Sequence, residues 1–110
     1  MKNVIEKLPS LYRKDIERAI EILKKSGAKE IYIFGSIVNG NTNNNSDIDL
    51  AVKGIYQDDF YKVLSVLYFE LKNNVDLVDL DDKENRFSKM LLESGELLKV
   101  GWNNKKANMF

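Results

Sequence analysis

Residues 31–52, with the sequence IYIFGSIVNGNTNNNSDIDLAV, decide the fold because two apolar runs flank a turn and a polar loop. The first run, residues 31–34, predicts a buried strand that ends at Gly35 and Ser36. A short helical stretch over residues 37–39 follows, so this turn presents backbone N–H groups at a helix N-terminus, where phosphate oxygens bind readily. Gly35 lets a ligand approach the backbone, and the Ser36 hydroxyl can donate to a phosphate oxygen or cap the helix. The turn therefore predicts a phosphate-binding site.

A pair of carboxylates opens the second apolar run. Asp47 and Asp49 stand on either side of Ile48, and side chains alternate along a strand, so both carboxylates point to the same side. Two carboxylates so close repel each other unless a cation lies between them, and Mg²⁺ prefers oxygen ligands of this kind. Each feature alone is common in strand ends and turns. Their order along the chain predicts a metal site beside a phosphate site, as a nucleoside triphosphate requires.

The composition indicates one small domain over residues 1–110. A chain of 110 residues with 44% hydrophobic content can build a core, but it leaves no room for a second domain that would hold an acceptor. We therefore expect a partner to supply acceptor recognition, and we expect residues 103–110 to fray. The chain has no cysteine, no signal peptide pattern and no apolar run of membrane-spanning length, which favours a cytoplasmic protein.

The charges are unevenly distributed although they sum to zero. Residues 31–82 carry a net charge of −6, and the segments before and after them carry +3 each. A surface that binds nucleic acid would instead gather basic residues near the site. The charge pattern therefore argues against nucleic acid as a partner.

The remaining elements are read from periodicity and turn residues. A helix is expected from Pro9-Ser10 to a stop at Gly27, and residues 41–46 are expected to form a polar loop. Further apolar patterns predict a helix at about 58–72 and a strand at 75–80. A last helix carries Phe87, Met90, Leu91 and Leu92 and ends at Gly95. Helices that alternate with short strands predict an α/β fold with a small mixed sheet covered by helices.

The helix at 58–72 is apolar around most of its circumference, since Tyr61, Val66, Tyr68 and Phe69 lie partly outside its main stripe. Such a helix is either buried on two sides or part of an interface. We favour core packing and keep a partner-binding face as the alternative.

The block GSIVNGNTNNNSDIDLAV resembles the signature of the minimal nucleotidyltransferases, small members of the DNA polymerase beta-like superfamily. The resemblance extends over roughly residues 16–100, since VDLVDL occupies the place of the strand with the family's third carboxylate and FSKMLLESGELLK resembles the segment that ends many of these chains. It implies a minimal nucleotidyltransferase fold, two Mg²⁺ ions and ATP as substrate.

The third carboxylate is Asp76 or Asp79. These residues are three apart on one predicted strand, so they face opposite sides and only one can join Asp47 and Asp49. The resemblance selects Asp76 and leaves Asp79 as a solvated strand end. The expected catalytic and metal-binding residues are thus Asp47, Asp49 and Asp76, with Gly35 and Ser36 on the phosphates.

The resemblance implies an antitoxin that transfers AMP from ATP to a tyrosine of a HEPN-domain toxin, a protein AMPylation. Two alternatives stay open: an antitoxin of the same fold that acts by contact alone, and a nucleotidyltransferase for a small molecule. The contact reading rests on Asn39, because the family commonly has arginine there and asparagine offers no charge for phosphate. Lys53 is a candidate for a replacement cation.

Overall fold

The structure is a computed structural model that describes residues 8–40 and 47–102. Its elements in chain order are α2 (Ser10–Lys25), β1 (Glu30–Phe34), α3 (Ser36–Asn39), β2 (Ile48–Lys53), the short 3-10 helix η1 (Gln57–Asp59), α4 (Phe60–Glu70), β3 (Val75–Asp79), α5 (Arg86–Ser94) and β4 (Leu98–Trp102). The predicted loop at 41–46 and the predicted tail at 103–110 lie outside the described residues. None of the helices in the described part is long and apolar enough to cross a membrane.

The four strands form one mixed sheet in the order β3-β2-β1-β4. Strand β1 is antiparallel to both β2 and β4, whereas β2 and β3 are parallel. The connection between the parallel strands contains α4, as a parallel pair requires a crossover. The predicted α/β class with a mixed sheet is confirmed, but β4 was not predicted.

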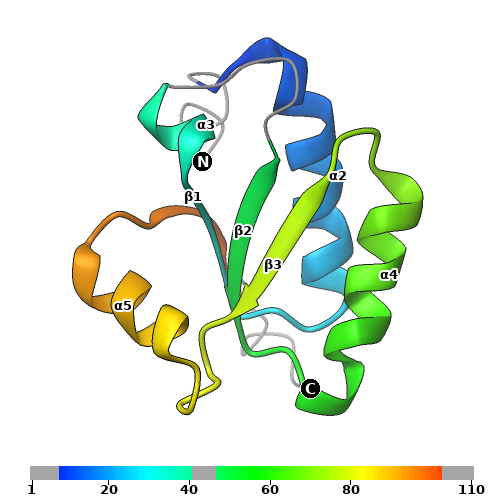
Figure 1. The fold of residues 1–110 in the computed structure, drawn as a ribbon. Helices are drawn as coiled ribbons and strands as arrows, with labels where there is room; N and C mark the ends of the chain where they lie inside the picture. Colours follow the sequence, from blue (N-terminus) through cyan, green and yellow to red (C-terminus); the bar gives the residue numbers. More distant parts are fainter. Residues whose placement is uncertain (1–7, 41–46, 103–110) are drawn as a thin grey trace.

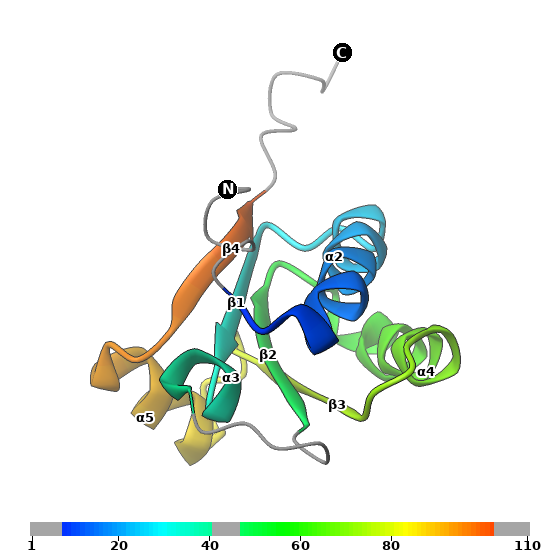
Figure 2. The same ribbon diagram turned by 90° about the horizontal axis from the view of Figure 1, so that it is seen from above.

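Alternation along the strands sorts the apolar side chains onto two faces. One face carries Ile31 and Ile33 from β1 and Ile48, Leu50 and Val52 from β2, all without exposed surface. Helices α2 and α4 cover this face (Figure 2). Burial of these side chains against the two helices forms the main core.

The other face of the sheet is covered only in part. Phe34, Ala51, Leu80 and Leu91 form a second, smaller buried cluster there, and Leu91 comes from α5. Figure 1 shows α5 beside the sheet at one side and α3 at the end of β1. The carboxylates at the start of β2 lie on this incompletely covered face.

The bounds and the packing of helix α4 differ from the prediction. It ends at Glu70 rather than near residue 72, and only Val63 and Leu67 within it are buried. Tyr61 is 76% exposed and Phe69 is 92% exposed, with Tyr68 and Val66 also exposed. The expected core packing is therefore wrong for these outer side chains, because the sheet covers one face of α4 and nothing described covers the opposite face.

Candidate active site

The structure brings Asp49 and Asp76 into one row of the sheet. In the register of the parallel strands, Asp49 of β2 lies opposite Asp76 of β3, and on its other side Asp49 lies opposite Phe34 of β1. Residues directly opposite in a sheet project to the same face, so the two carboxylates are neighbours. Asp47 is exposed and immediately precedes β2, two residues from Asp49 on the same side.

The electrostatics of Asp49 reflect this crowding. The pKa of the Asp49 carboxyl is raised to about 6, first by burial and then by the negative charges of Asp76 and Asp47. The three predicted carboxylates thus interact in the folded chain, and Asp49 is at their centre. A cation beside Asp49 would lower the free energy of its ionised form.

Gly35 has a steric role that the sequence did not reveal. Its φ of 80° lies in the left-handed region, and a Cβ at this position would overlap Oδ2 of Asp49 and approach its Cγ to 3.2 Å. A side chain here would therefore displace the central carboxylate as well as strain the backbone. The turn and the carboxylates form one local unit.

The helix after Gly35 begins at Ser36, one residue earlier than predicted, with Gly35 as its N-cap and no side-chain hydrogen bond that caps it. The N–H groups of Val38 and Asn39 donate to the Gly35 carbonyl at 3.1 Å and 3.0 Å, which closes the first turn of α3. The amides of Ser36 and Ile37 precede these donors, so they have no acceptor within the helix. The start of α3 and the Asp49 carboxylate therefore both lie next to Gly35.

The donor set fits Mg²⁺ bound together with a nucleotide. In residues 8–40 and 47–102, no three carboxylates close around a common point as a complete metal site. Mg²⁺ is usually held by one or two carboxylates together with water and substrate phosphates rather than by a cage of protein ligands. Asp49 and its neighbours supply the carboxylates, and a triphosphate on the Gly35 turn would supply the other oxygens.

The missing arginine is not replaced by Lys53. Asn39 is exposed at the end of α3, as the sequence suggested. Lys53 is opposite Glu30 at the far end of β2, four residues or roughly 13 Å along the strand from Asp49. The suggestion that Lys53 serves the phosphate turn is therefore wrong.

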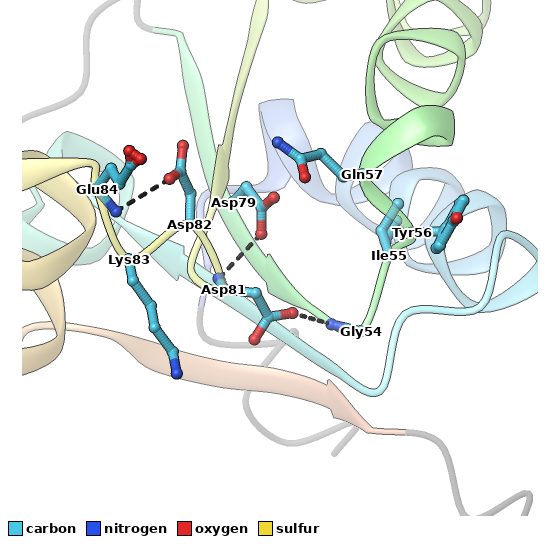
Figure 3. A pocket seen from close by; sticks show the side chains of 9 residues that line it. All are labelled: Gly54, Ile55, Tyr56, Gln57, Asp79, Asp81, Asp82, Lys83 and Glu84. Atoms are coloured by element: carbon cyan, nitrogen blue, oxygen red, sulfur yellow. Dashed lines mark hydrogen bonds between the residues drawn. The ribbon is translucent and has the colours of Figure 1, made fainter.

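Asp79 belongs to a different part of the molecule, a cavity of about 600 Å³ at the far end of β3 (Figure 3). Its Oδ1 accepts a hydrogen bond from the N–H of Asp81 at 2.9 Å, and Oδ2 of Asp81 accepts one from the N–H of Gly54 at 2.7 Å. Burial raises the pKa of Asp79, and the bond from Asp81 opposes that shift. Asp79 is thus partly buried and holds a turn, rather than being the solvated strand end that we expected.

Phe87 is a further residue near the site that the sequence analysis named only as an apolar helix residue. Its ring lies 5.9 Å from the Phe34 ring, between centroids, and Phe34 is the register partner of Asp49. The apolar pattern of the last helix showed that Phe87 belongs to a packed stripe. It could not show which strand the ring would reach.

Comparison with known proteins agrees with this arrangement. A family model described as polymerase beta, nucleotidyltransferase, matches residues 17–100. The chain belongs to this nucleotidyltransferase family. The match spans the Gly35 turn and all three carboxylates, and no curated protein sequence matches the chain.

Solved structures show that this nucleotidyltransferase has the minimal nucleotidyltransferase fold. A chain in a crystal structure of a toxin-antitoxin complex with AMP-PNP has a TM-score of 0.64 and 23% identity, over 84% of this chain and 77% of that one. A protein assigned to the minimal nucleotidyltransferases gives 0.61 and 22%, over 83% and 92%. A structure of a tri-AMPylated Shewanella oneidensis HEPN toxin in complex with an MNT antitoxin gives 0.59 and 20%, over 88% and 77%.

Proposed function

We propose that this nucleotidyltransferase is a Mg²⁺-dependent antitoxin that transfers AMP from ATP to a tyrosine hydroxyl of a HEPN-domain partner in the cytoplasm. The observation that carries the proposal is the row that contains Asp49 and Asp76, with Asp47 and the Gly35 turn beside it. Carboxylates that crowd one another beside a glycine turn suit a metal-bound triphosphate.

The site residues divide the chemistry between them. The Gly35 turn and Ser36 hold the β- and γ-phosphates, while Asp47 and Asp49 hold the metal side of the triphosphate. Mg²⁺, when bound, neutralises charge that develops on the phosphate oxygens and lowers the pKa of nearby hydroxyls. Catalysis by the chain itself is then mainly positioning.

The proposed transfer needs no reactant besides ATP and the acceptor hydroxyl. The acceptor oxygen forms a bond to the α-phosphorus, the bond from that phosphorus to the bridging oxygen breaks, and pyrophosphate leaves with the electron pair. We assign Asp76, the register partner of Asp49, to the acceptor side, where it would help to hold the metal and would take the proton that the hydroxyl releases. The products are an AMP ester of the acceptor and pyrophosphate.

The proposed partner follows from similar proteins. Several of the similar structures are described as toxin-antitoxin complexes, among them one with AMP-PNP and one with a tri-AMPylated HEPN toxin. Helix α4 exposes several aromatic side chains that a partner could cover. This surface fits an enzyme whose acceptor arrives as a separate protein.

The test is label transfer with the two proteins purified together. ATP labelled at the α-phosphate should leave label on the HEPN protein in the presence of Mg²⁺, and ATP labelled at the γ-phosphate should leave none. Replacement of the acceptor tyrosine by phenylalanine should remove the label. Label from the γ-phosphate would show a kinase reaction and refute the proposal.

A second function is favoured by Asn39. Without the usual arginine, and with Lys53 too distant to replace it, triphosphate binding is expected to be weaker. An antitoxin that neutralises its partner by contact alone would tolerate this loss. Full neutralisation of the toxin by an Asp49→Asn variant would favour this second function.

A further inference from the structure

An aromatic side chain is held beside the carboxylate row by three separate contacts of α5. The Phe87 ring packs on Phe34 with a centroid distance of 5.9 Å and an interplanar angle of 60°. Four residues later on the same side of the helix, Leu91 is buried in the cluster that contains Phe34 and Ala51. The helix therefore turns its Phe87 side toward the sheet face that bears Asp49.

The first turn of α5 is fixed in place. Oδ1 of Asn85 accepts hydrogen bonds from the N–H groups of Phe87 and Ser88, which caps the helix. The hydroxyl of Ser88, which is only 1% exposed, donates to the carbonyl of Asp79 at 2.8 Å and ties the helix to the end of β3. These bonds tie the start of α5 to the sheet, and the packing on Phe34 then places the Phe87 ring.

From this anchor the ring reaches back along the sheet. Ser88 contacts Asp79 at the C-terminal end of β3. Phe87 instead contacts Phe34, which lies in the same row of the sheet as Asp49 and Asp76, near the N-terminal end of β3. The ring therefore extends over the sheet face from one end of β3 toward the carboxylate row. Its partner Phe34 is also the residue immediately before Gly35.

Phe87 nevertheless remains 43% exposed, whereas Phe34 and Leu91 on the same face are buried. A flat apolar ring that is firmly held, yet open to solvent beside a phosphate-binding turn, is suited to contact with another planar group. A nucleobase stacks on such rings, and it does so with little preference among bases.

We propose that Phe87 is a nucleobase platform, on which the base of ATP stacks while the triphosphate occupies the Gly35 turn. This inference rests on the proposed function, since it assigns the base-binding residue of the same site. It implies that the ring contributes to nucleoside binding, with no part in holding the triphosphate. Contact with the base also makes Phe87 a determinant of how the nucleotide is oriented toward the acceptor.

The test compares two ligands by calorimetry at saturating Mg²⁺: ATP and inorganic tripolyphosphate, which has no base. Phe87→Leu keeps an apolar side chain against Phe34 but removes the flat ring, and Phe87→Ala removes both. Either variant should bind ATP about five- to tenfold more weakly than the wild type. Both should bind tripolyphosphate within about twofold of the wild type, because the triphosphate turn is untouched.

Phe69→Ala is the matched control, because it removes an aromatic ring that is 92% exposed on α4, across the sheet from α5. It should change neither affinity. Where Phe87→Ala fails to fold, as judged by circular dichroism, Phe87→Leu decides the question.

Wild-type affinity for ATP in Phe87→Leu would overturn the inference and leave the proposed function standing. Equal weakening for ATP and tripolyphosphate would also overturn it, since the ring would then only support the site. Unchanged ATP binding with loss of transfer would assign Phe87 to the acceptor instead. A wild-type protein that binds neither ligand would refute the proposed function itself.

Discussion

Asp49→Asn should stabilise the metal-free protein at neutral and alkaline pH. The amide has nearly the same shape as the carboxyl, but it carries no charge to be penalised by burial or repelled by Asp76 and Asp47. The folded protein holds the pKa of Asp49 at about 6, against 3.8 for an ordinary aspartate. Taken in full, that difference corresponds to about 3 kcal/mol. Because Asp49 is only partly buried, solvent screening reduces the expected gain to about 1 kcal/mol.

The pH dependence has a definite sign. Below pH 3.8 the Asp49 carboxyl is protonated in both the folded and the unfolded chain, so the wild type and Asp49→Asn should be equally stable. As the pH rises toward 6, the unfolded chain releases the proton first and the wild type loses stability relative to the variant. Above pH 6 the difference should be constant.

The assay is thermal unfolding, followed by circular dichroism between pH 3 and pH 8 with a chelator present. A gain of about 1 kcal/mol corresponds to a Tm about 4–8 °C higher for the variant at pH 8 and no difference at pH 3. Asp58→Asn, in the exposed turn of η1, is the control and should match the wild type throughout. A variant no more stable than the wild type at pH 8 would refute the idea that burial and the neighbouring carboxylates destabilise the ionised form of Asp49.

Four further substitutions test the site. Asp76→Asn should abolish AMP transfer to the partner, while its ATP affinity stays within about threefold of the wild type. Asp79→Asn should leave transfer intact. Loss of label transfer in Asp79→Asn but not in Asp76→Asn would mean that the wrong carboxylate was chosen. Asn39→Arg should tighten ATP binding about fivefold in calorimetry, since a charge-assisted contact nets about 1 kcal/mol after ordering costs; no gain would show that the turn needs no arginine. Gly35→Ala should lower the free energy of unfolding by about 1–3 kcal/mol in urea, because the φ of residue 35 is positive and the Cβ of alanine would overlap the Asp49 carboxylate. An unchanged free energy of unfolding would contradict the close approach of Asp49 to Gly35.

The carboxylate row could be predicted because it depends on local patterns. Alternation along a strand places Asp47 and Asp49 on one side whatever the rest of the chain does. The same rule separates Asp76 from Asp79, although only the resemblance indicated which of the two to choose. The register that sets Asp49 opposite Asp76 is a long-range property, and the structure supplied it.

Features that depend on packing between distant segments were missed. Strand β4 pairs with β1 across most of the chain, and its alternation of Leu98 and Val100 with Lys99 and Gly101 is too short to be decisive by itself. The apolar pattern of α4 showed that the helix is apolar on several sides, but not that the sheet would cover only the side with Val63 and Leu67. The contact of Phe87 with Phe34 depends on the path of the chain between β3 and α5, which no periodicity encodes.

The central claim is that Asp47 and Asp49 bind a metal together with a nucleotide, and calorimetry with Mg-ATP tests it most directly. The wild type should bind Mg-ATP, and removal of Mg²⁺ by a chelator should weaken the binding of ATP. The double variant Asp47→Asn with Asp49→Asn should fold, and its affinity for ATP should no longer depend on Mg²⁺. Equal Mg-ATP affinity in the wild type and the double variant would contradict the account.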